Sequence, residues 1–395
     1  MDWERLKERF ENSASGRKFL AFASKLYGWG VKLDQGAYLH GFKWTKKVRA
    51  RVVCIGNLTA GGTGKTTAVM LAAMAMAGSG IRVAIVSRGY KRQKKTTRPV
   101  ILFENFKGDW RSTGDEPFMM SRVLAPYKIP IVVSPDRVWA AKTAIRKFKS
   151  QLILLDDGLQ HYRLKRNANI VLVDAENPFG NGQLLPYGIL REPLTAFKRA
   201  ALVILTHCDQ VDEEDLEDMK AVIHQYNPRV PVLESVHHPQ CYVDMCSSRR
   251  IPLKEIHGPA ACFCALGNPD SFENTLESLG LELKQRWRFP DHQHYTEEML
   301  HTFQATREDL PLITTFKDFV KLPKNWRSIL ERDVYVLSVN LKIRGGEHEK
   351  KLFLSTLYPD LFKKTAQAGQ TSAVQNATPV ESVVAPQPQK GASAK

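Results

Sequence analysis

The sequence predicts an α/β protein built on a doubly wound, mostly parallel β-sheet, with a second, smaller α/β domain and an N-terminal amphipathic helix. Three observations predict this fold class. A glycine-rich turn joins an apolar strand to a helical segment within residues 51–67. Further short apolar strands then alternate with helical segments, as in parallel sheets whose strands are connected by helices. Another apolar strand, residues 151–158, carries two consecutive aspartates near its end.

The length of the chain predicts more than one domain. At 395 residues, it exceeds what a single hydrophobic core usually supports. The last residues are dominated by Ala, Gln, Ser, Thr and Pro and show no helical or strand periodicity, so we expect them to be disordered. We therefore predict a basic amphipathic N-terminal segment, a core domain, a smaller domain that completes a cleft, and a disordered tail, at residues 1–48, 49–210, 211–350 and 367–395.

The glycine-rich turn predicts a phosphate-binding loop. Glycines let the backbone take positive φ and bring N–H groups close to phosphate oxygens, and the following helix adds its positive N-terminal end. Lys65 would neutralise phosphate charge and the Thr66 hydroxyl would ligate Mg²⁺, so the core is of the P-loop NTPase type. Thr59 stands where the usual pattern has glycine, and a plain turn with an exposed lysine is the alternative. The predicted nucleotide-binding residues are Thr59, Gly61, Gly62, Thr63, Gly64, Lys65 and Thr66.

Two pairs of carboxylates are candidates for the chemistry. Asp156 and Asp157 follow a buried strand about ninety residues after the loop, where a carboxylate of this fold reaches Mg²⁺ or its water shell. Asp115 and Glu116 follow a glycine and offer a base or a metal ligand. Helix capping by Thr113 or Asp115 is the alternative for the second pair. The predicted metal ligands are Thr66, Glu116, Asp156 and Asp157.

The N-terminal segment and the net charge of +16 predict an anionic partner. Apolar residues at spacings of three and four share one helical face, and lysines repeat on another. Such a basic amphipathic helix suits a membrane surface, and packing on the protein body is the alternative. Glycines at 28, 30 and 36 weaken an uninterrupted helix. The apolar face consists of Phe19, Phe22, Leu26, Trp29 and Leu33.

Several classes of protein are disfavoured. The sequence shows no helix-turn-helix, zinc-finger or aromatic ribonucleoprotein pattern, so we expect no nucleic-acid partner. The longest apolar run, Ala68 to Gly78, is too short to span a bilayer, and the first residues lack the apolar core of a signal peptide. None of the six cysteines forms a C-x-x-C pair, so reduced thiols and a cytoplasmic location are expected.

Taken together, the motifs resemble those of the tetraacyldisaccharide 4′-kinase family over roughly residues 15–345. The ordered set makes the resemblance specific, although Thr67 and Gln293 depart from residues common in the family. The motifs are Gly56–Thr59, Gly61–Thr66, Ser87–Tyr90, Gly114–Pro117, Asp156–His161, Phe179–Gly182, Leu184–Pro186, Leu190–Pro193, Gly267–Pro269, Asp291–His292, Lys317–Asp318 and Val320–Lys321.

The resemblance implies a reaction and a set of roles. ATP with Mg²⁺ would phosphorylate the 4′-hydroxyl of tetraacyldisaccharide 1-phosphate in lipid A biosynthesis. It implies a peripheral enzyme on the cytoplasmic face of the bacterial inner membrane, in contact with anionic lipid and without a predicted protein partner. Asp115 would be the base, His292 would pair with it across the domain cleft, and Lys65 would act on the phosphates. The implied substrate-side residues are Tyr90, Arg137 and Arg191.

Two other functions remain open at this level. Residues 206–209 resemble the base-reading motif of GTPases, so a P-loop GTPase or metallochaperone-like ATPase without a lipid acceptor is one alternative. His207 stands where that motif has lysine, and no metal-ligand cluster is evident, which argues against it. A non-enzymatic membrane-surface protein is the other, and the intact Lys65 and Asp156 argue against that.

Overall fold

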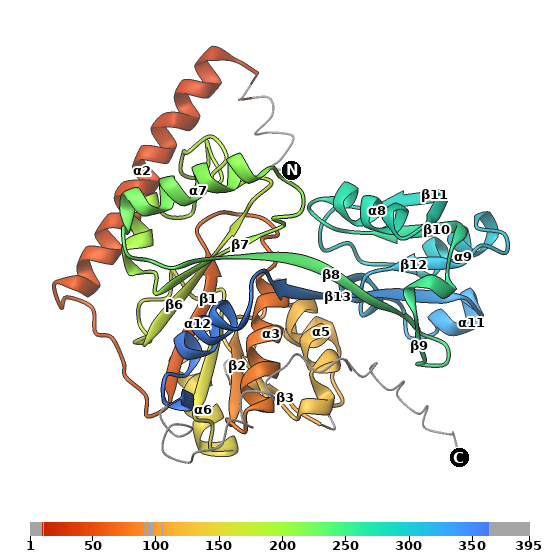
Figure 1. The fold of residues 1–395 in the computed structure, drawn as a ribbon, viewed down its shortest axis with the longest axis horizontal. Coiled ribbons are helices and arrows are strands. Elements are labelled where there is room, and N and C mark those ends of the chain that lie inside the picture. The colour runs from red at the N-terminus through yellow and green to blue at the C-terminus, as the bar shows by residue number, and fades with distance from the viewer. Residues whose placement is uncertain are drawn as a thin grey trace.

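The computed structural model describes residues 10–362 except residues 11, 91, 94, 95, 97 and 105. The predicted disordered tail, residues 367–395, and most of the first ten residues lie outside the described part of the chain. The described residues form a single 13-stranded sheet with helices on both faces (Figure 1). The predicted α/β class with a mostly parallel sheet is confirmed.

The first lobe contains the phosphate-loop strand at its centre. Its strands run in the order β8-β7-β6-β1-β5-β2-β4-β3, and only the edge strand β3 is antiparallel to its neighbour within β1–β7. The parallel strands bring their carboxyl ends to one edge of the sheet, where ligands of doubly wound folds bind. The bounds are β1 Arg51–Asn57, β2 Val83–Ser87, β3 Val100–Leu102, β4 Ile131–Val133, β5 Leu152–Asp156, β6 Ala168–Asp174, β7 Leu202–Thr206 and β8 Val232–Asp244.

Alternate residues of β1 face two different cores. Val53 and Ile55 pack with residues of α3 and α5, whereas Val52 and Cys54 pack with residues of α6 and α7. Because strand side chains alternate between faces, an apolar run such as this needs helices on both sides. The helices of this lobe are α3 Lys65–Gly78, α4 Trp110–Thr113, α5 Asp115–Val123, α6 Arg137–Phe148 and α7 Glu213–Tyr226, with short 3₁₀ helices at Ala125–Tyr127 and Leu194–Arg199.

Two long strands connect the first lobe to the second. β8 pairs in parallel with β7 at its start and then runs antiparallel to β13 as far as Asp244 (Figure 1). After β13, the chain returns to the first lobe, where Arg51 donates hydrogen bonds to the last carbonyls of α12. The strands of the second lobe are β9 Arg250–Ile251, β10 Gly258–Cys264, β11 Leu281–Arg288, β12 Leu312–Thr314 and β13 Val334–Ile343. Its helices are α8 Pro269–Ser278, α9 Glu297–Thr306, α10 Phe316–Phe319 and α11 Trp326–Leu330, with a short 3₁₀ helix at Leu253–Glu255. The helix α12, which follows β13, is Glu347–Leu357.

The N-terminal helix α2, Ala14–Leu39, lies against the first lobe on the side away from the second lobe (Figure 1). Its buried stripe is made of Gly16, Leu20, Ser24 and Gly28. The predicted apolar face points elsewhere and stays exposed, with Trp29 at 70% of its maximum accessibility. Within the described residues, no helix has the length and apolar character needed to cross a membrane.

Candidate active site

A large cavity opens at the carboxyl ends of the central parallel strands and extends between the two lobes. Its volume is about 2280 Å³, and residues of the phosphate loop, of α5 and of the second lobe line it. Asn57, Ser87, Asp156, Asp174 and Thr206 are the last residues of five neighbouring strands, β1, β2, β5, β6 and β7. The strand order therefore explains why polar side chains from distant parts of the sequence meet in this place.

The phosphate loop closes on itself in a conformation that depends on glycine. Gly61 has φ +125° and Gly64, the N-cap of α3, has φ +68°. A Cβ on Gly64 would also lie 2.9 Å from His237 Cε1. The Lys65 ammonium donates to Asn57 Oδ1 and to the Gly61 carbonyl, at 3.1 and 3.3 Å, so it lies over the mouth of its own loop.

Thr59 differs from the other predicted nucleotide-binding residues. Its side chain is buried and accepts a hydrogen bond from Asn57 Nδ2 at 3.2 Å. It does not line the cavity, whereas the residues from Gly61 to Thr66 all do. Instead, Thr59 forms a β-bridge with Leu190, so it ties the start of the loop to the segment that carries Arg191. Thr59 therefore stabilises the start of the phosphate loop from outside the cavity.

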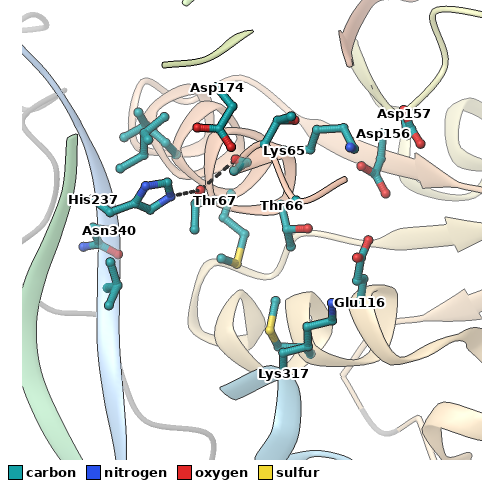
Figure 2. A pocket seen from close by; sticks show the side chains of 18 of the residues that line it. Lys65, Thr66, Thr67, Glu116, Asp156, Asp157, Asp174, His237, Lys317 and Asn340 are labelled. Atoms are coloured by element: carbon teal, nitrogen blue, oxygen red, sulfur yellow. Dashed lines mark hydrogen bonds between the residues drawn. The ribbon is translucent and has the colours of Figure 1, made fainter. Parts of the chain in front are cut away.

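Three carboxylates converge beside the phosphate loop. Figure 2 shows Glu116 and Asp156 pointing toward the same space, with Asp157 next to them and Lys65 above. Burial, together with the charges of Glu116 and Asp157, raises the pKa of Asp156 to about 7. Ser87 Oγ donates to Asp156 Oδ2 at 2.9 Å. Asp157 Oδ1 is buried without a hydrogen-bond partner in the described part of the chain.

This carboxylate set fits a hard divalent cation. Oxygen ligands are those that Mg²⁺ prefers. A cation would offset the cost of burying the charges of Asp156 and Glu116 and the repulsion between neighbouring carboxylates. The orphaned Asp157 Oδ1 is one coordination position that nothing else in the described residues satisfies. Asp157 Oδ2 is already taken, because Arg191 donates to it at 2.8 Å.

Asp115 and His292 meet across the cavity. His292 Nδ1 donates to Asp115 Oδ2 at 2.8 Å, and both side chains are largely buried. Burial alone would raise the pKa of Asp115, but the hydrogen bond and charge of His292 and the charge of Lys317 hold it below its usual value. Gly114 occupies the N-cap of α5, and Thr113 does not cap the helix. Asp115 Oδ1 accepts a hydrogen bond from the Glu116 N–H at 3.0 Å, so Asp115 satisfies one N–H of the first turn while its other oxygen pairs with His292. Asp115 is the first residue of α5, where the helix dipole favours a carboxylate.

The three predicted substrate-side residues all line the cavity. Tyr90 is exposed, and its ring meets the His292 ring edge-on at 5.8 Å between centroids. Arg137 is buried, which lowers its pKa to about 10, and its Nε has no partner among the described residues. Arg191 pairs with Asp157. The structure thus brings together two arginines and a tyrosine around the carboxylates.

The GTPase-like segment after β7 forms a different kind of contact. His207 Nδ1 donates to Asp174 Oδ1 at 2.8 Å, and its ring stacks on His237 at 4.3 Å. Burial would lower the pKa of His207, but the hydrogen bond to Asp174 raises it above its usual value. A histidine hydrogen-bonded to a strand-end carboxylate therefore stands where the GTPase motif has its lysine.

Sequence reasoning assigns no role to two side chains of this site, His237 and Lys317, although Lys317 belongs to one of the family motifs. His237 comes from β8, and its Nε2 lies 3.1 Å from Thr67 Oγ1 in the first turn of α3. Lys317 extends from the second lobe toward the part of the cavity that holds Glu116 (Figure 2). Neither residue follows a glycine-rich turn or sits at a catalytic spacing. Only the pairing of β8 with β7 and the fold of the second lobe bring them here.

The comparisons with known proteins agree with this geometry. Residues 17–358 match the model of the tetraacyldisaccharide-1-P 4′-kinase family, LpxK. A tetraacyldisaccharide 4′-kinase from Elusimicrobium minutum is 54% identical over 360 residues, which cover 91% of this chain and 96% of that protein. One from Halothermothrix orenii is 34% identical, over 82% of this chain and 89% of that protein.

A solved structure supports the same assignment. LpxK from Aquifex aeolicus, determined in complex with ATP, superposes with a TM-score of 0.67 at 30% sequence identity. The match covers 87% of this chain and 99% of that chain. The resemblance inferred from the motifs is therefore confirmed: the chain belongs to the tetraacyldisaccharide-1-P 4′-kinase family.

Proposed function

We propose that this kinase transfers the γ-phosphoryl group of ATP to the 4′-hydroxyl of tetraacyldisaccharide 1-phosphate, with Asp115 as the base. The observation that carries the proposal is the contact between Asp115 and His292 within one cavity with the phosphate loop. A carboxylate held ionised by a histidine accepts a proton from a hydroxyl, and orientation of the acceptor is most of what phosphoryl transfer needs from the protein.

The phosphate loop would bind the nucleotide phosphates, and the carboxylates would bind Mg²⁺. Backbone N–H groups of residues 61–66 and the start of α3 would bind the phosphates, with Lys65 neutralising their charge. Thr66, Glu116, Asp156 and Asp157 would hold Mg²⁺, which supplies charge neutralisation on the transferring group. Arg191 lies next to Asp157, so its guanidinium is suited to contact a phosphate there.

Membrane contact follows from the exposed face of α2. Five large apolar side chains on one face are each more than half exposed: Phe19, Phe22, Leu26, Trp29 and Leu33. Burying such a stripe in a lipid interface is favourable, and the net positive charge attracts anionic headgroups. We propose that α2 docks on the cytoplasmic face of the bacterial inner membrane, where an acylated substrate resides.

The helix α2 is also attached to the site. Tyr27 OH donates to the Arg191 carbonyl at 3.0 Å, and Gln35 Nε2 donates to Glu192 at 2.7 Å. Ser24 Oγ donates to the Leu184 carbonyl at 2.8 Å. A lipid that enters along α2 would therefore arrive beside Arg191, in the cavity that Tyr90 and Asp115 also line.

The identity of the product tests the proposal. The full chain would be incubated in detergent with ATP, Mg²⁺ and tetraacyldisaccharide 1-phosphate, and the lipid fraction analysed by mass spectrometry. We expect one added phosphate, located at the 4′ position by fragmentation. Phosphate at another position, or none while ATP is consumed, would contradict the proposed acceptor.

A further inference from the structure

His292 depends on neighbours to keep its place. It has φ +67°, a left-handed conformation that costs a residue with a side chain about 1 kcal/mol. Its backbone N–H donates to Asp291 Oδ1 at 2.9 Å, and its Nε2 lies 3.5 Å from Asp291 Oδ2. The imidazole is thus held between two carboxylates, Asp115 on Nδ1 and Asp291 near Nε2. Asp291 supports both the backbone and the ring of His292.

Lys317 holds Asp291 in turn. Its ammonium donates to Asp291 Oδ1 at 2.8 Å, and its side chain is 20% exposed. Burial would lower the pKa of Lys317, but Asp291, Glu116 and Asp115 together raise it, so the ammonium faces carboxylates of both lobes. Lys317 belongs to α10, which contacts α5, the helix that begins with Asp115.

The buried side chain of Asp318 connects the segment that carries Lys317 to the loop that carries His292. Asp318 is fully buried and accepts hydrogen bonds from the Ala265 N–H, Tyr295 OH and Thr315 Oγ1. It also pairs with Lys321 at 2.9 Å. Tyr295 lies three residues after His292, and Asp318 lies one residue after Lys317, so the hydrogen bond between Tyr295 and Asp318 connects the two segments. None of the contacts of Asp318 involves the Lys317 ammonium, so removing its charge should leave them intact.

We propose that Lys317 is a positioning residue of the phosphoryl-transfer site, which acts through Asp291 to hold His292 against Asp115. The inference rests on the proposed function, because it assigns a role in serving the proposed base. A salt bridge between surface groups would contribute little. Here the pair of Lys317 and Asp291 holds His292, whose ring must stay within hydrogen-bond reach of Asp115 on the other lobe. Small displacements of a group at a reacting centre reduce turnover strongly.

Kinetics of five variants of the full chain test this inference. The set is Lys317→Met, Lys317→Arg, Asp291→Asn, the double variant Lys317→Met/Asp291→Asn, and Lys324→Met as the control, since Lys324 is an exposed lysine of the same lobe. We expect Lys317→Met to lower kcat at least ~30-fold while KM for ATP changes less than ~3-fold. Arginine should restore kcat to within ~5-fold of the wild type, because it keeps the charge.

The double variant separates action through Asp291 from an independent role. If Lys317 works through Asp291, its loss should cost less than ~3-fold once Asp291 is already Asn, because effects within one unit are not additive. Fully multiplicative losses would overturn the inference. So would a raised KM for ATP at unchanged kcat, which would mark Lys317 as a phosphate-binding group.

A second measurement does not depend on turnover. The side-chain nitrogen resonances of His292, assigned with a His292→Gln variant, should change in Lys317→Met and Asp291→Asn but not in Lys324→Met. Unchanged resonances would overturn the positioning role whatever the activity. Conversely, a wild type that phosphorylates no lipid would refute the proposed function while the spectra still decide whether Lys317 positions His292.

Discussion

Asp115 Oδ2 and His292 Nδ1 lie 2.8 Å apart although 177 positions separate the two residues in the sequence. One begins a helix of the first lobe, and the other lies in a loop of the second. The strands β8 and β13 connect these lobes. A change in how the lobes meet would alter this contact, so the arrangement couples lobe closure to the state of the proposed base.

Replacing Asp115 by Asn should remove the base and keep the shape of the site. We expect kcat to fall by about 10²–10⁴-fold, the range for loss of a general base. ATP affinity should stay within a few-fold, because Asp115 does not belong to the phosphate loop. Steady-state kinetics at saturating lipid, with ATP binding measured separately by calorimetry, provide the check. Near-normal kcat for this variant would remove Asp115 from the mechanism.

Gly64→Ala should damage the phosphate loop. The position has φ +68°, and the new Cβ would approach His237. We expect a loss of stability on the order of 1 kcal/mol and a clear rise in KM for ATP. The matched control is Gly30→Ala in α2, where no atom lies within 4 Å of the added Cβ. That change should raise stability slightly, by up to about 1 kcal/mol.

These two predictions also show what the sequence could reveal. The loop, the paired aspartates and their order defined the nucleotide site, because each depends on neighbours in sequence. The roles of Lys317 and His237 could not be found in that way. Their partners Asp291 and Thr67 become their neighbours only through the fold of the second lobe and the pairing of β8 with β7.

Helix α2 shows the same limit. The spacing predicts its apolar face but leaves open whether that face is exposed, and Gly28 reads from the sequence alone as a residue that weakens the helix. In the structure, Gly28 is buried, and a Cβ there would lie 2.7 Å from Leu184 Cδ1. The glycine allows α2 to approach the segment that leads to Arg191. Small residues at a packing face are hard to distinguish from helix breakers before the partner is known.

Removing apolar side chains from α2 should weaken membrane binding without disturbing the site. Trp29 and Leu33 are 70% and 72% exposed, so Trp29→Ser with Leu33→Ser should fold normally. We expect vesicle binding to fall at least ~10-fold, in proportion to the apolar area lost. Flotation with vesicles that contain an anionic phospholipid measures it. Trp139→Ser, an exposed tryptophan on α6, should leave binding unchanged. Equal losses in both would argue against α2 as the docking surface.

Acid should destabilise the protein partly through His237. Burial, with the nearby charge of His207, lowers the pKa of His237 to about 4. The unfolded chain, with an ordinary histidine pKa of about 6.5, therefore binds the proton more readily than the folded one. Stability is full above about pH 6.5 and declines as the pH falls toward 4.

The contribution of His237 can be isolated by substitution. Between pH 7 and pH 5 we expect His237 to account for a loss on the order of 1–2 kcal/mol. Urea denaturation of the wild type and of His237→Gln at both pH values measures it, because the variant cannot titrate there. The free energy of unfolding should fall more steeply between pH 7 and pH 5 for the wild type than for the variant. Parallel pH dependence would show that His237 gains no proton on unfolding.

Acceptor-dependent phosphate transfer tests the central claim most directly. The protein would be incubated with γ-labelled ATP and Mg²⁺ in detergent, with and without tetraacyldisaccharide 1-phosphate, beside a Lys65→Ala variant. We predict label in the lipid only for the wild type and only when the acceptor is present. Label released as free phosphate at the same rate with or without the lipid would contradict the account and favour an ATPase or GTPase.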